Sequence, residues 1–275
     1  MSLRRISVVL PVRNGEAHVA KAIDSILAQT FQDFELVVVD DGSTDRTPAI
    51  LGSITDSRVR VLTQAATGLT VALARGVAES RGALVARMDA DDVALPERFA
   101  RQVAFLDGHS EVGLLGTGCH EIGSSGEIVR TIRPPADDTA IRRVLIRRNP
   151  FIHSSVVVRR NALEAAGGYD ESLPVAQDYD LWLRMSRVTR MANLAEPLVL
   201  RRLTPGRVTL ARETERLRAE VRIKLRVLRR GDYPVWCGVF LVKPLVALAL
   251  PGGLRRRLRR ALSAEARSGA LIGVD

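Results

Sequence analysis

Short apolar runs and helical stretches alternate along the first 120 residues of the chain. The runs are rich in β-branched residues and end near Gly, Asp or Thr; they cover residues 6–11, 34–39, 59–62, 83–88 and 112–115. Between them, apolar residues recur at helical spacing, as Val19, Ile23 and Ile26 do. This alternation predicts stacked βαβ units. We therefore expect an α/β fold whose mostly parallel central sheet is flanked by helices and buried on both faces.

The pattern is looser after residue 120. A Gly/Ser turn within 122–129 predicts a hairpin, residues 152–158 predict a further strand, and residues 179–187 predict a helix. An Arg-rich amphipathic stretch follows at 208–230, and then an apolar segment at 235–250 that Lys243 and Pro244 interrupt. A basic run covers residues 254–260. We expect a domain over residues 1–205 and a basic, helical, amphipathic extension over residues 206–275.

Carboxylates gather directly after two of the predicted strands. Ligands of parallel sheets bind beyond the carboxyl ends of the strands, which makes these residues candidates for a site. Asp40 and Asp41 open a DDGSTD segment, which also fits a turn with a cap on the next helix. The DADD segment at 89–92 has three carboxylates that repel one another without a cation, and helix capping by Asp92 explains one of them at most. Its Asp-x-Asp spacing suits a hard divalent cation that also binds phosphate oxygens.

The net positive charge of the chain comes from its last 75 residues. The 275 residues have a formal net charge of +10, but residues 201–275 alone carry 18 Lys and Arg against 6 Asp and Glu. This asymmetry indicates an added interaction surface on an ordinary domain. The two cysteines, Cys119 and Cys237, form neither a disulfide framework nor a zinc-binding pair, and they fit a reduced, cytosolic setting. The apolar run at 6–12 is too short for a signal peptide or a membrane-spanning helix.

Seven segments, in order along the chain, form a recognisable set. They are ISVVLPVRNG (6–15), SILAQTF (25–31), ELVVVDDGSTD (35–45), RMDADD (87–92), NPFIHSSV (149–156), GGYDE (167–171) and QDYDLWLR (177–184). In this combination the chain resembles family 2 glycosyltransferases over about residues 4–205. The resemblance implies a GT-A-type nucleotide-sugar-binding fold and the inverting transfer of a sugar to an acceptor hydroxyl.

The resemblance implies a donor site at the ends of the first strands. Pro11 and Arg13 would line the pocket for the nucleotide base, and Asp41 would hold the base, which is uracil in the uridine-using members. Asp89 and Asp91 would contact the ribose or the diphosphate. The implied donor is a nucleotide-diphosphate sugar of the UDP or dTDP type.

The resemblance further implies a metal ion and a general base. Asp91 or Asp92 would bind Mn²⁺ or Mg²⁺, whose charge offsets that of the leaving diphosphate. Asp178 would take the proton of the acceptor hydroxyl, although an Asp at this position also suits a helix cap. Gln177 stands where many relatives have Glu, which bears on the orientation of Asp178, and Ala74 stands where many have Asn.

The remaining histidines and tryptophans have weaker assignments. His153 is a candidate contact of the acceptor or the diphosphate, and a buried, hydrogen-bonded histidine fits its position equally. Trp182 lies at helical spacing from Met185, which favours a place in the core. The other histidines lack partners at metal-ligand spacing, so we expect no histidine-based metal site.

The basic tail has three interpretations. A helix with Arg222, Arg226 and Arg229 on one side fits solvated charge over a packed apolar face. The segment at 235–250 is shorter than the ~20 residues needed to span a bilayer. Because basic residues flank it, it suits docking on an anionic membrane surface. Nucleic-acid binding is disfavoured because the arginines are not interleaved with stacking aromatic residues.

Together these patterns predict a metal-dependent inverting glycosyltransferase for cell-envelope polysaccharide or glycolipid synthesis. We expect a lipid-linked or glycan acceptor and a cytoplasmic enzyme that is peripheral at the inner face of the cytoplasmic membrane. A sugar-nucleotide pyrophosphorylase is the first alternative, but residues 11–15 lack its Gly-rich basic loop. The second is a non-catalytic, membrane-docked nucleotide-sugar-binding protein, which the joint presence of the Asp residues at 41, 91, 92 and 178 disfavours. The donor sugar, the linkage and the formation of a homo-oligomer stay open.

Overall fold

Residues 4–203 and 212–251 are described from a computed structural model of the chain. The chain divides into two compact units, Met1–Val208 and Thr209–Asp275. The boundary expected between residues 205 and 206 lies outside the described residues, as does the basic run at 254–260. The division into a domain of residues 1–205 and an extension therefore stays a prediction.

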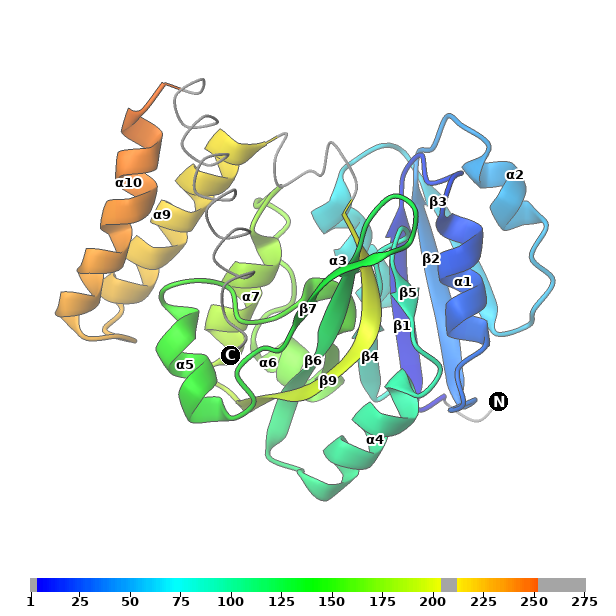
Figure 1. Ribbon diagram of the computed structural model, residues 1–275, viewed down its shortest axis with the longest axis horizontal. Helices are drawn as coiled ribbons and strands as arrows, with labels where there is room; N and C mark the ends of the chain where they lie inside the picture. Colours follow the sequence, from blue (N-terminus) through cyan, green and yellow to red (C-terminus); the bar gives the residue numbers. More distant parts are fainter. Residues whose placement is uncertain (1–3, 204–211, 252–275) are drawn as a thin grey trace, which may run out of the picture. The chain divides into compact units, whose positions relative to one another are not determined.

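The first unit opens with the predicted alternation of strands and helices (Figure 1). Its elements up to the fourth strand are β1 (Ile6–Val12), α1 (Val19–Leu27), β2 (Phe34–Asp41), α2 (Thr47–Gly52), β3 (Val59–Gln64), α3 (Leu69–Glu79) and β4 (Leu84–Arg87). The four strands pair in parallel in the order β3-β2-β1-β4. The predicted α/β class is confirmed, and the first four apolar runs are strands.

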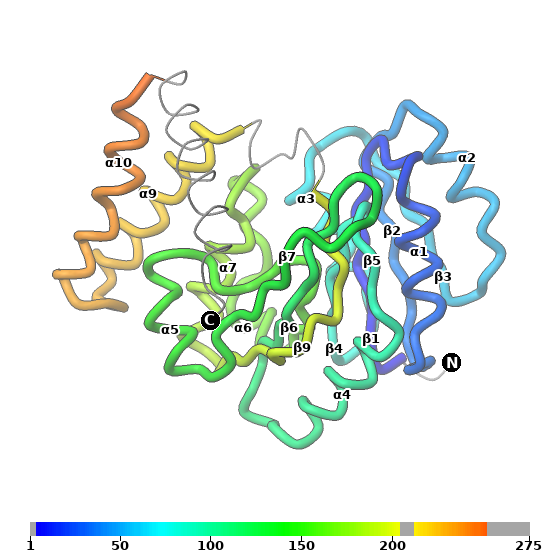
Figure 2. The backbone as a smooth tube through the Cα atoms, in the orientation of Figure 1, coloured from blue at the N-terminus to red at the C-terminus, as the bar shows by residue number. Residues whose placement is uncertain are grey.

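The second part of the sheet is mixed. Its elements are β5 (Val93–Ala94), α4 (Arg98–Gly108), β6 (Val112–Ile122), β7 (Ile128–Ile132), α5 (Asp138–Leu145), η1 (His153–Ser155), β8 (Val157–Arg159), α6 (Arg160–Ala165), α7 (Gln177–Met185) and β9 (Arg190–Arg202). β8 is antiparallel to β4 and β6, β9 is parallel to β6, and β5 and β7 are antiparallel to β9 and β6. In Figure 2 the long strands β6 and β9 run side by side. Beyond β4 the sheet is thus less uniformly parallel than the sequence pattern predicts.

Three predicted elements have different bounds in the structure. The strand expected at 152–158 is the 3-10 turn η1 followed by the short strand β8, because Ser155 donates its N–H and its Oγ–H to the carbonyl of Ile152 and turns the chain. The helix expected at 179–187 covers Gln177–Met185. The helix expected over residues 94–106, after the DADD segment, covers Arg98–Gly108 with Glu97 as its N-cap, so Asp92 does not cap it. The hairpin predicted within 122–129 is confirmed, with β6 and β7 paired across the turn.

Helices cover both faces of the parallel strands. α1 and α4 pack on one face, in a buried cluster with alternate residues of β1 and β2. α3 covers the other face, where Ala72 packs on Val37 and Val39. α3 lies close against the sheet at Gly76, where a Cβ would lie 2.5 Å from Cγ1 of Val9. Because helices cover both faces here, the open surfaces of this part of the sheet are at the two ends of its strands.

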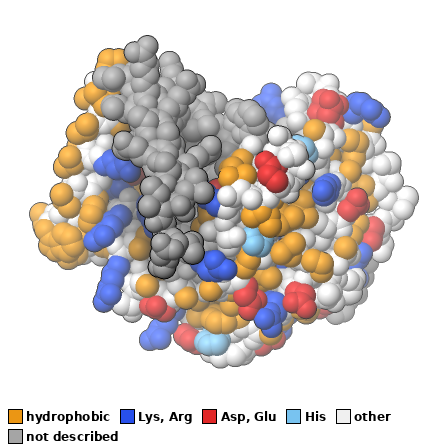
Figure 3. All heavy atoms as spheres, in the orientation of Figure 1, with side chains coloured by type: hydrophobic (Ala, Val, Ile, Leu, Met, Phe, Trp, Pro, Cys, Tyr) orange, Lys and Arg blue, Asp and Glu red, His pale blue; other side chains and the backbone are white. Residues whose placement is uncertain are grey.

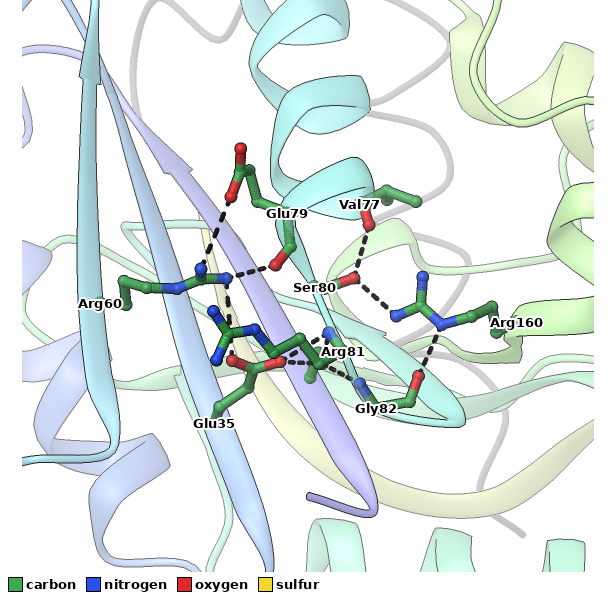
Figure 4. Close-up of polar contacts among 9 residues, drawn as sticks. Glu35, Arg60, Val77, Glu79, Ser80, Arg81, Gly82 and Arg160 are labelled. Atoms are coloured by element: carbon green, nitrogen blue, oxygen red, sulfur yellow. Dashed lines mark hydrogen bonds and ion pairs between the residues drawn. The ribbon is translucent and has the colours of Figure 1, made fainter. Parts of the chain in front are cut away.

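A polar network closes the amino-terminal ends of these strands (Figure 4). Glu35 accepts hydrogen bonds from the hydroxyl of Ser7 at 2.6 Å and from the N–H of Arg81 at 2.7 Å. Arg60 of β3 forms an ion pair with the same carboxylate, and Arg160 of α6 donates to the turn between α3 and β4. With this edge closed by the protein itself, the carboxyl-terminal edge is the one that faces the candidate site.

The second unit is a helical hairpin in its described residues 212–251. α9 (Glu213–Arg229) is followed by the 3-10 segment η2 (Val235–Leu241) and by α10 (Val242–Ala249), both of which contact α9. The buried Lys224 of α9 donates to the carbonyl of Phe240 at 3.2 Å. The amphipathic helix expected at 208–230 is present, and the interruption expected within 235–250 falls where η2 meets α10. Among the described residues, the structure contains no helix of the length and hydropathy needed to span a membrane.

Candidate active site

The loops that follow β1 and β2 are fastened to each other at the carboxyl end of the sheet. Asn14 has a left-handed backbone conformation with φ 52°. Its Oδ1 accepts the N–H of Thr44 at 2.8 Å, and its own N–H donates to Oγ of Ser43 at 2.9 Å. The two loops that carry Arg13 and Asp41 are thereby held together, as a shared binding site requires.

Pro11 and Arg13 lie on either side of the end of β1. Pro11 is buried and stands opposite Val39 of β2 in the parallel ladder. Arg13 is exposed directly after the strand. Both residues thus lie at the edge where the sequence predicts the base pocket, Pro11 buried within the strand and Arg13 exposed after it.

Asp41 fastens the loop between β3 and α3. Its Oδ1 accepts from Nε2 of Gln64 at 2.8 Å and from the N–H of Thr67 at 2.9 Å, and its Oδ2 accepts from the N–H of Gly68 at 2.9 Å. Burial alone raises the pKa of Asp41, but these hydrogen bonds outweigh it and hold the pKa below its ordinary value. The turn interpretation applies to Asp40, whose Oδ1 accepts the N–H of Ser43.

Three carboxylates meet in the loop after β4. One oxygen from each of Asp89, Asp91 and Asp92 lies within 4.8 Å of the others. Asp92 is buried; its Oδ1 accepts the N–H of Arg202 at 2.9 Å, and its Oδ2 has no hydrogen-bond partner within the described part of the chain. Burial and then the charges of Asp89 and Asp91 raise the pKa of Asp92 to about 7, although the side chain of Ser154 and the N–H of Arg202 act in the opposite direction. A buried oxygen without a donor, beside two further carboxylates, fits a divalent cation of the Mg²⁺ or Mn²⁺ kind.

Two arginines beside this cluster were not predicted as site residues from the sequence. Arg87, the last residue of β4, is buried and forms an ion pair with Asp89. Arg202, the last residue of β9, donates from Nε to the carbonyl of Asp91 at 3.3 Å. Arg87 lies within the recognised RMDADD segment, which is a usable signal. Arg202 ends a strand that the hydrophobic pattern does not predict, so the sequence has no signal for it.

Asp178 is the second residue of α7, two positions after the N-cap Ala176, whose φ is 59°. Its Oδ2 accepts from Nδ2 of Asn149 at 2.7 Å, and its Oδ1 accepts the N–H of Tyr179 at 2.8 Å. The N-cap position belongs to Ala176, so Asp178 is not the helix cap. Burial raises the pKa of Asp178, and its hydrogen bonds and the charge of Arg87 offset this only in part. A half-buried carboxylate with a raised pKa suits a general base.

His153 is half-buried and hydrogen-bonded. Its Nε2 lies 2.8 Å from the hydroxyl of Tyr169, and its ring meets the edge of Trp182 with 5.9 Å between centroids. Burial and then the charge of Arg87 lower the pKa of His153 well below its ordinary value, so the ring is neutral at pH 7. Trp182 is fully buried, as its helical spacing predicts.

Arg87 joins the carboxylate cluster to the candidate base. Its charge acts on Asp92, His153 and Asp178 as well as on its ion-pair partner Asp89. Asp178 and the carboxylate cluster thus both lie within the electrostatic influence of one buried guanidinium, although the two are about ninety residues apart in the sequence. Pro11, Arg13 and Asp41 lie on the neighbouring strand ends. The fold therefore gathers the predicted residues at one edge of the sheet.

Comparison with known proteins identifies the family. The model of the family described as Glycosyl transferase family 2 matches residues 7–167. The chain belongs to family 2 of the glycosyltransferases. This glycosyltransferase is 33% identical over 208 residues to the O-antigen biosynthesis glycosyltransferase WbnJ of Escherichia coli, an alignment that covers 72% of the chain and 81% of WbnJ. These matches favour a glycosyltransferase over both alternatives, the sugar-nucleotide pyrophosphorylase and the non-catalytic nucleotide-sugar-binding protein.

Solved structures assign the fold of the glycosyltransferase to the GT-A type. TarS of S. aureus (residues 1–349, in complex with UDP-GlcNAc) matches with a TM-score of 0.67 and 21% identity, over 88% of this chain and 71% of that one. The mannosyltransferase PcManGT from Pyrobaculum calidifontis, in complex with GDP-Man and Mn²⁺, matches with a TM-score of 0.63 and 21% identity, over 99% of this chain and 82% of that one. The predicted GT-A-type fold is confirmed.

Proposed function

We propose that this glycosyltransferase transfers a sugar from a nucleotide-diphosphate donor of the UDP or dTDP type to an acceptor hydroxyl, with inversion at the anomeric carbon and with the help of a divalent metal ion. The observation that carries the proposal is the pairing of two features around Arg87. One is a carboxylate cluster with a buried, unpartnered oxygen on Asp92, and the other is the separately held carboxylate of Asp178. The name of WbnJ and the UDP-GlcNAc complex of TarS support this class of reaction.

The donor nucleotide would bind across the ends of β1, β2 and β4. Pro11 and Arg13 would line the pocket for the base, and Asp41 would hold the base from its place under the β3–α3 loop. Asp89 and Asp91 would lie on the ribose and diphosphate side. Because the loops after β1 and β2 are hydrogen-bonded to each other, the pocket is formed before the donor arrives, which lowers the entropic cost of binding.

Asp91 and Asp92 would hold the metal ion, Mn²⁺ or Mg²⁺. These residues fit it because they are hard oxygen ligands that lie close together, and because Oδ2 of Asp92 has no donor among the described residues. When bound, such an ion neutralises charge on the leaving diphosphate as a Lewis acid. Arg202 keeps the loop in place by donating to both Asp92 and the carbonyl of Asp91.

Asp178 would accept the proton of the acceptor hydroxyl. The bond from Nδ2 of Asn149 orients Oδ2, and burial raises the pKa of the carboxyl toward that of a useful base. A single base and direct displacement of the diphosphate invert the anomeric centre. The nearby Asp180 is less suited, since its carboxylate is buried and pairs with Arg184 at 2.8 Å. His153 is bonded to Tyr169 and would shape the acceptor side without transferring a proton.

The acceptor would be a lipid-linked or glycan hydroxyl in the synthesis of a cell-envelope polysaccharide or glycolipid. The name of WbnJ, which refers to O-antigen biosynthesis, supports the polysaccharide class. The excess of basic residues over acidic ones in residues 201–275, 18 against 6, supports work at the inner face of the cytoplasmic membrane as a peripheral protein.

A screen of nucleotide sugars tests the proposed donor class. The full chain is heated with each of a panel of UDP, dTDP and GDP sugars, in Mn²⁺, in Mg²⁺ and in EDTA. A donor at 100 times its dissociation constant stabilises the fold by about 2.7 kcal/mol, which shifts the melting temperature by several degrees. We expect a shift with UDP or dTDP sugars that EDTA removes. The absence of a shift with every sugar and metal would contradict the proposal.

A further inference from the structure

The second unit leaves a row of apolar side chains exposed. Val235 is 90% exposed, and the other exposed fractions are 67% for Trp236, 57% for Val239, 55% for Val242, 48% for Leu245 and 53% for Val246. A surface helix normally presents polar residues to solvent. Contiguous exposed apolar residues mark a surface that contacts a partner. These six residues are called the apolar face below.

The apolar face belongs to a packed structure. Its residues recur at intervals of three or four along η2 and α10 and therefore lie on one side. On the other side, Cys237 and Pro244 are buried. Lys224 of α9 holds that side by donating to the carbonyl of Phe240, while its charge is paired with Glu220 at 2.8 Å. The packing of the hairpin itself therefore determines which side chains are exposed.

Basic residues lie beside the apolar face. Arg229 and Arg230 are exposed at the end of α9, and only residues 231–234 separate them from the first residues of the face. Lys243 is exposed on α10, within the row. Residues 212–251 carry nine Lys and Arg against four Asp and Glu, a net charge of +5. Figure 3 shows basic side chains next to hydrophobic ones along this hairpin.

We infer that the apolar face lies on the surface of an anionic phospholipid bilayer, with its aliphatic side chains and Trp236 among the acyl-chain ends and its arginines at the phosphates. Tryptophan favours the boundary between headgroups and hydrocarbon, and arginine extends its charge from an apolar setting to the headgroups. The helices lie on the membrane and do not cross it. The inference rests on the proposed function only in that a lipid-linked acceptor is met at a membrane.

Charge selects a membrane over a second copy of the chain. A symmetric dimer through the apolar face would bring two hairpins of net charge +5 together, whereas an anionic leaflet neutralises that charge. Each basic residue near such a surface adds ~1 kcal/mol, which is about a fivefold gain in affinity.

Tryptophan fluorescence tests the inference without any donor or acceptor. The chain has two tryptophans, and because Trp182 is fully buried, a change in emission on binding reports on Trp236. The full chain is titrated with vesicles of phosphatidylcholine alone or with phosphatidylglycerol. We expect a blue shift and quenching by brominated acyl chains with the anionic vesicles, and a much weaker effect with the neutral ones. Trp236→Phe should bind the same vesicles without the blue shift.

Matched variants separate insertion from simple charge attraction. Val239→Asp should weaken binding to the anionic vesicles at least tenfold, whereas Ile128→Asp, which replaces a residue of β7 that is also 57% exposed, should bind as the parent chain does. Arg229→Gln with Arg230→Gln should weaken binding about 25-fold, at fivefold for each charge.

Two results would overturn the inference. One is parent-like vesicle binding by Val239→Asp or an unquenched Trp236, because charge alone would then explain binding. The other is a dimer in solution that Val239→Asp dissociates, because a second copy would then cover the face. Calorimetric binding of UDP to the same variant in solution is measured in parallel. A failure of the proposed donor site thus appears in the nucleotide titration and a failure of docking in the vesicle titration.

Discussion

At the scale of single residues, the surroundings of Asp92 support the proposed cation more than a role in the stability of the fold. One of its oxygens is bonded to the N–H of Arg202, and the other is buried without a partner among the described residues. An unsatisfied buried polar group costs about 1–3 kcal/mol, and the two neighbouring carboxylates add repulsion. When a residue lowers the stability of the protein alone, a bound ligand that offsets this unfavourable free energy is indicated.

Replacing Asp92 by Asn tests this assignment. The amide keeps the size of the side chain and its bond to Arg202 but removes one charge from a self-repelling cluster. We expect an unchanged or slightly higher melting temperature without metal, and at least tenfold weaker metal-dependent binding of the nucleotide by calorimetry. Asp24→Asn, at an exposed position of α1, is the control and should change neither. Parent-like metal-dependent binding by Asp92→Asn would move the metal to other ligands.

The pH dependence of turnover tests the environment of Asp178. Burial raises its pKa above the ordinary 3.8, and the proposed base works only when ionised. The rate should therefore be constant at high pH and should fall as the pH drops through a value above 3.8. Asn149→Ala removes a hydrogen bond that favours the ionised form, so it should move this acid limb to higher pH. The measurement is kcat against pH, and an acid limb that Asn149→Ala leaves unmoved would contradict the account.

The sequence identifies most candidate site residues but few of their hydrogen-bond partners. Asp41, Asp91, Asp92 and Asp178 stand in recognisable motifs. The donors that hold them come from distant segments, as Arg202 does for Asp92 and Asn149 does for Asp178. Such partners depend on which segments the fold brings together, which local patterns do not encode. The same limit applies to pKa shifts, since burial is a property of the folded chain.

At the scale of elements, the parallel strands are predictable and β9 is not. β1, β2 and β4 are apolar runs that are buried in the sheet, and the edge strand β3 is an apolar run that is only partly buried. β9 has thirteen residues with a mixed burial pattern that includes the exposed pair Ala195 and Glu196, and its register against β6 shifts near Pro197. Its place in the sheet comes from long-range pairing with β6. The local hydrophobic pattern therefore does not predict this strand.

The close packing of α3 on the sheet gives a prediction for stability. A Cβ on Gly76 would lie 2.5 Å from Cγ1 of Val9, whereas a Cβ on Gly52 of α2 would meet no atom within 4 Å. Gly76→Ala should therefore lower the free energy of unfolding by about 1–3 kcal/mol, the usual cost of overpacking. Gly52→Ala should leave it unchanged or raise it, because Ala is the better helix former. Urea denaturation of both variants measures the difference, and equal effects would contradict the packing described for α3.

At the scale of the whole molecule, the net positive charge is concentrated in the last part of the chain. Residues 1–200 have a net charge of −2, and the excess of basic residues lies after them. The count of charges is available from the sequence, and so is the interruption of the segment at 235–250. The exposed apolar face is not, because a hydrophobic helix is ordinarily buried and only the packing against α9 shows which side stays outside. The sequence thus predicts an interaction surface in the tail, and the structure shows which side of the hairpin is apolar and exposed.

The central claim is that binding of the donor and activation of the acceptor are the work of separate groups, and Asp178→Asn tests it most directly. The amide keeps the size of the side chain but cannot take a proton. The measurement is sugar transfer, followed in the same preparation as calorimetric binding of the nucleoside diphosphate with Mn²⁺ or Mg²⁺. We predict parent-like binding and a loss of transfer of about 10²-fold or more, the scale of general-base catalysis, which higher pH does not restore. Loss of nucleotide binding would place Asp178 in the donor site, and unimpaired transfer would assign the base to another residue.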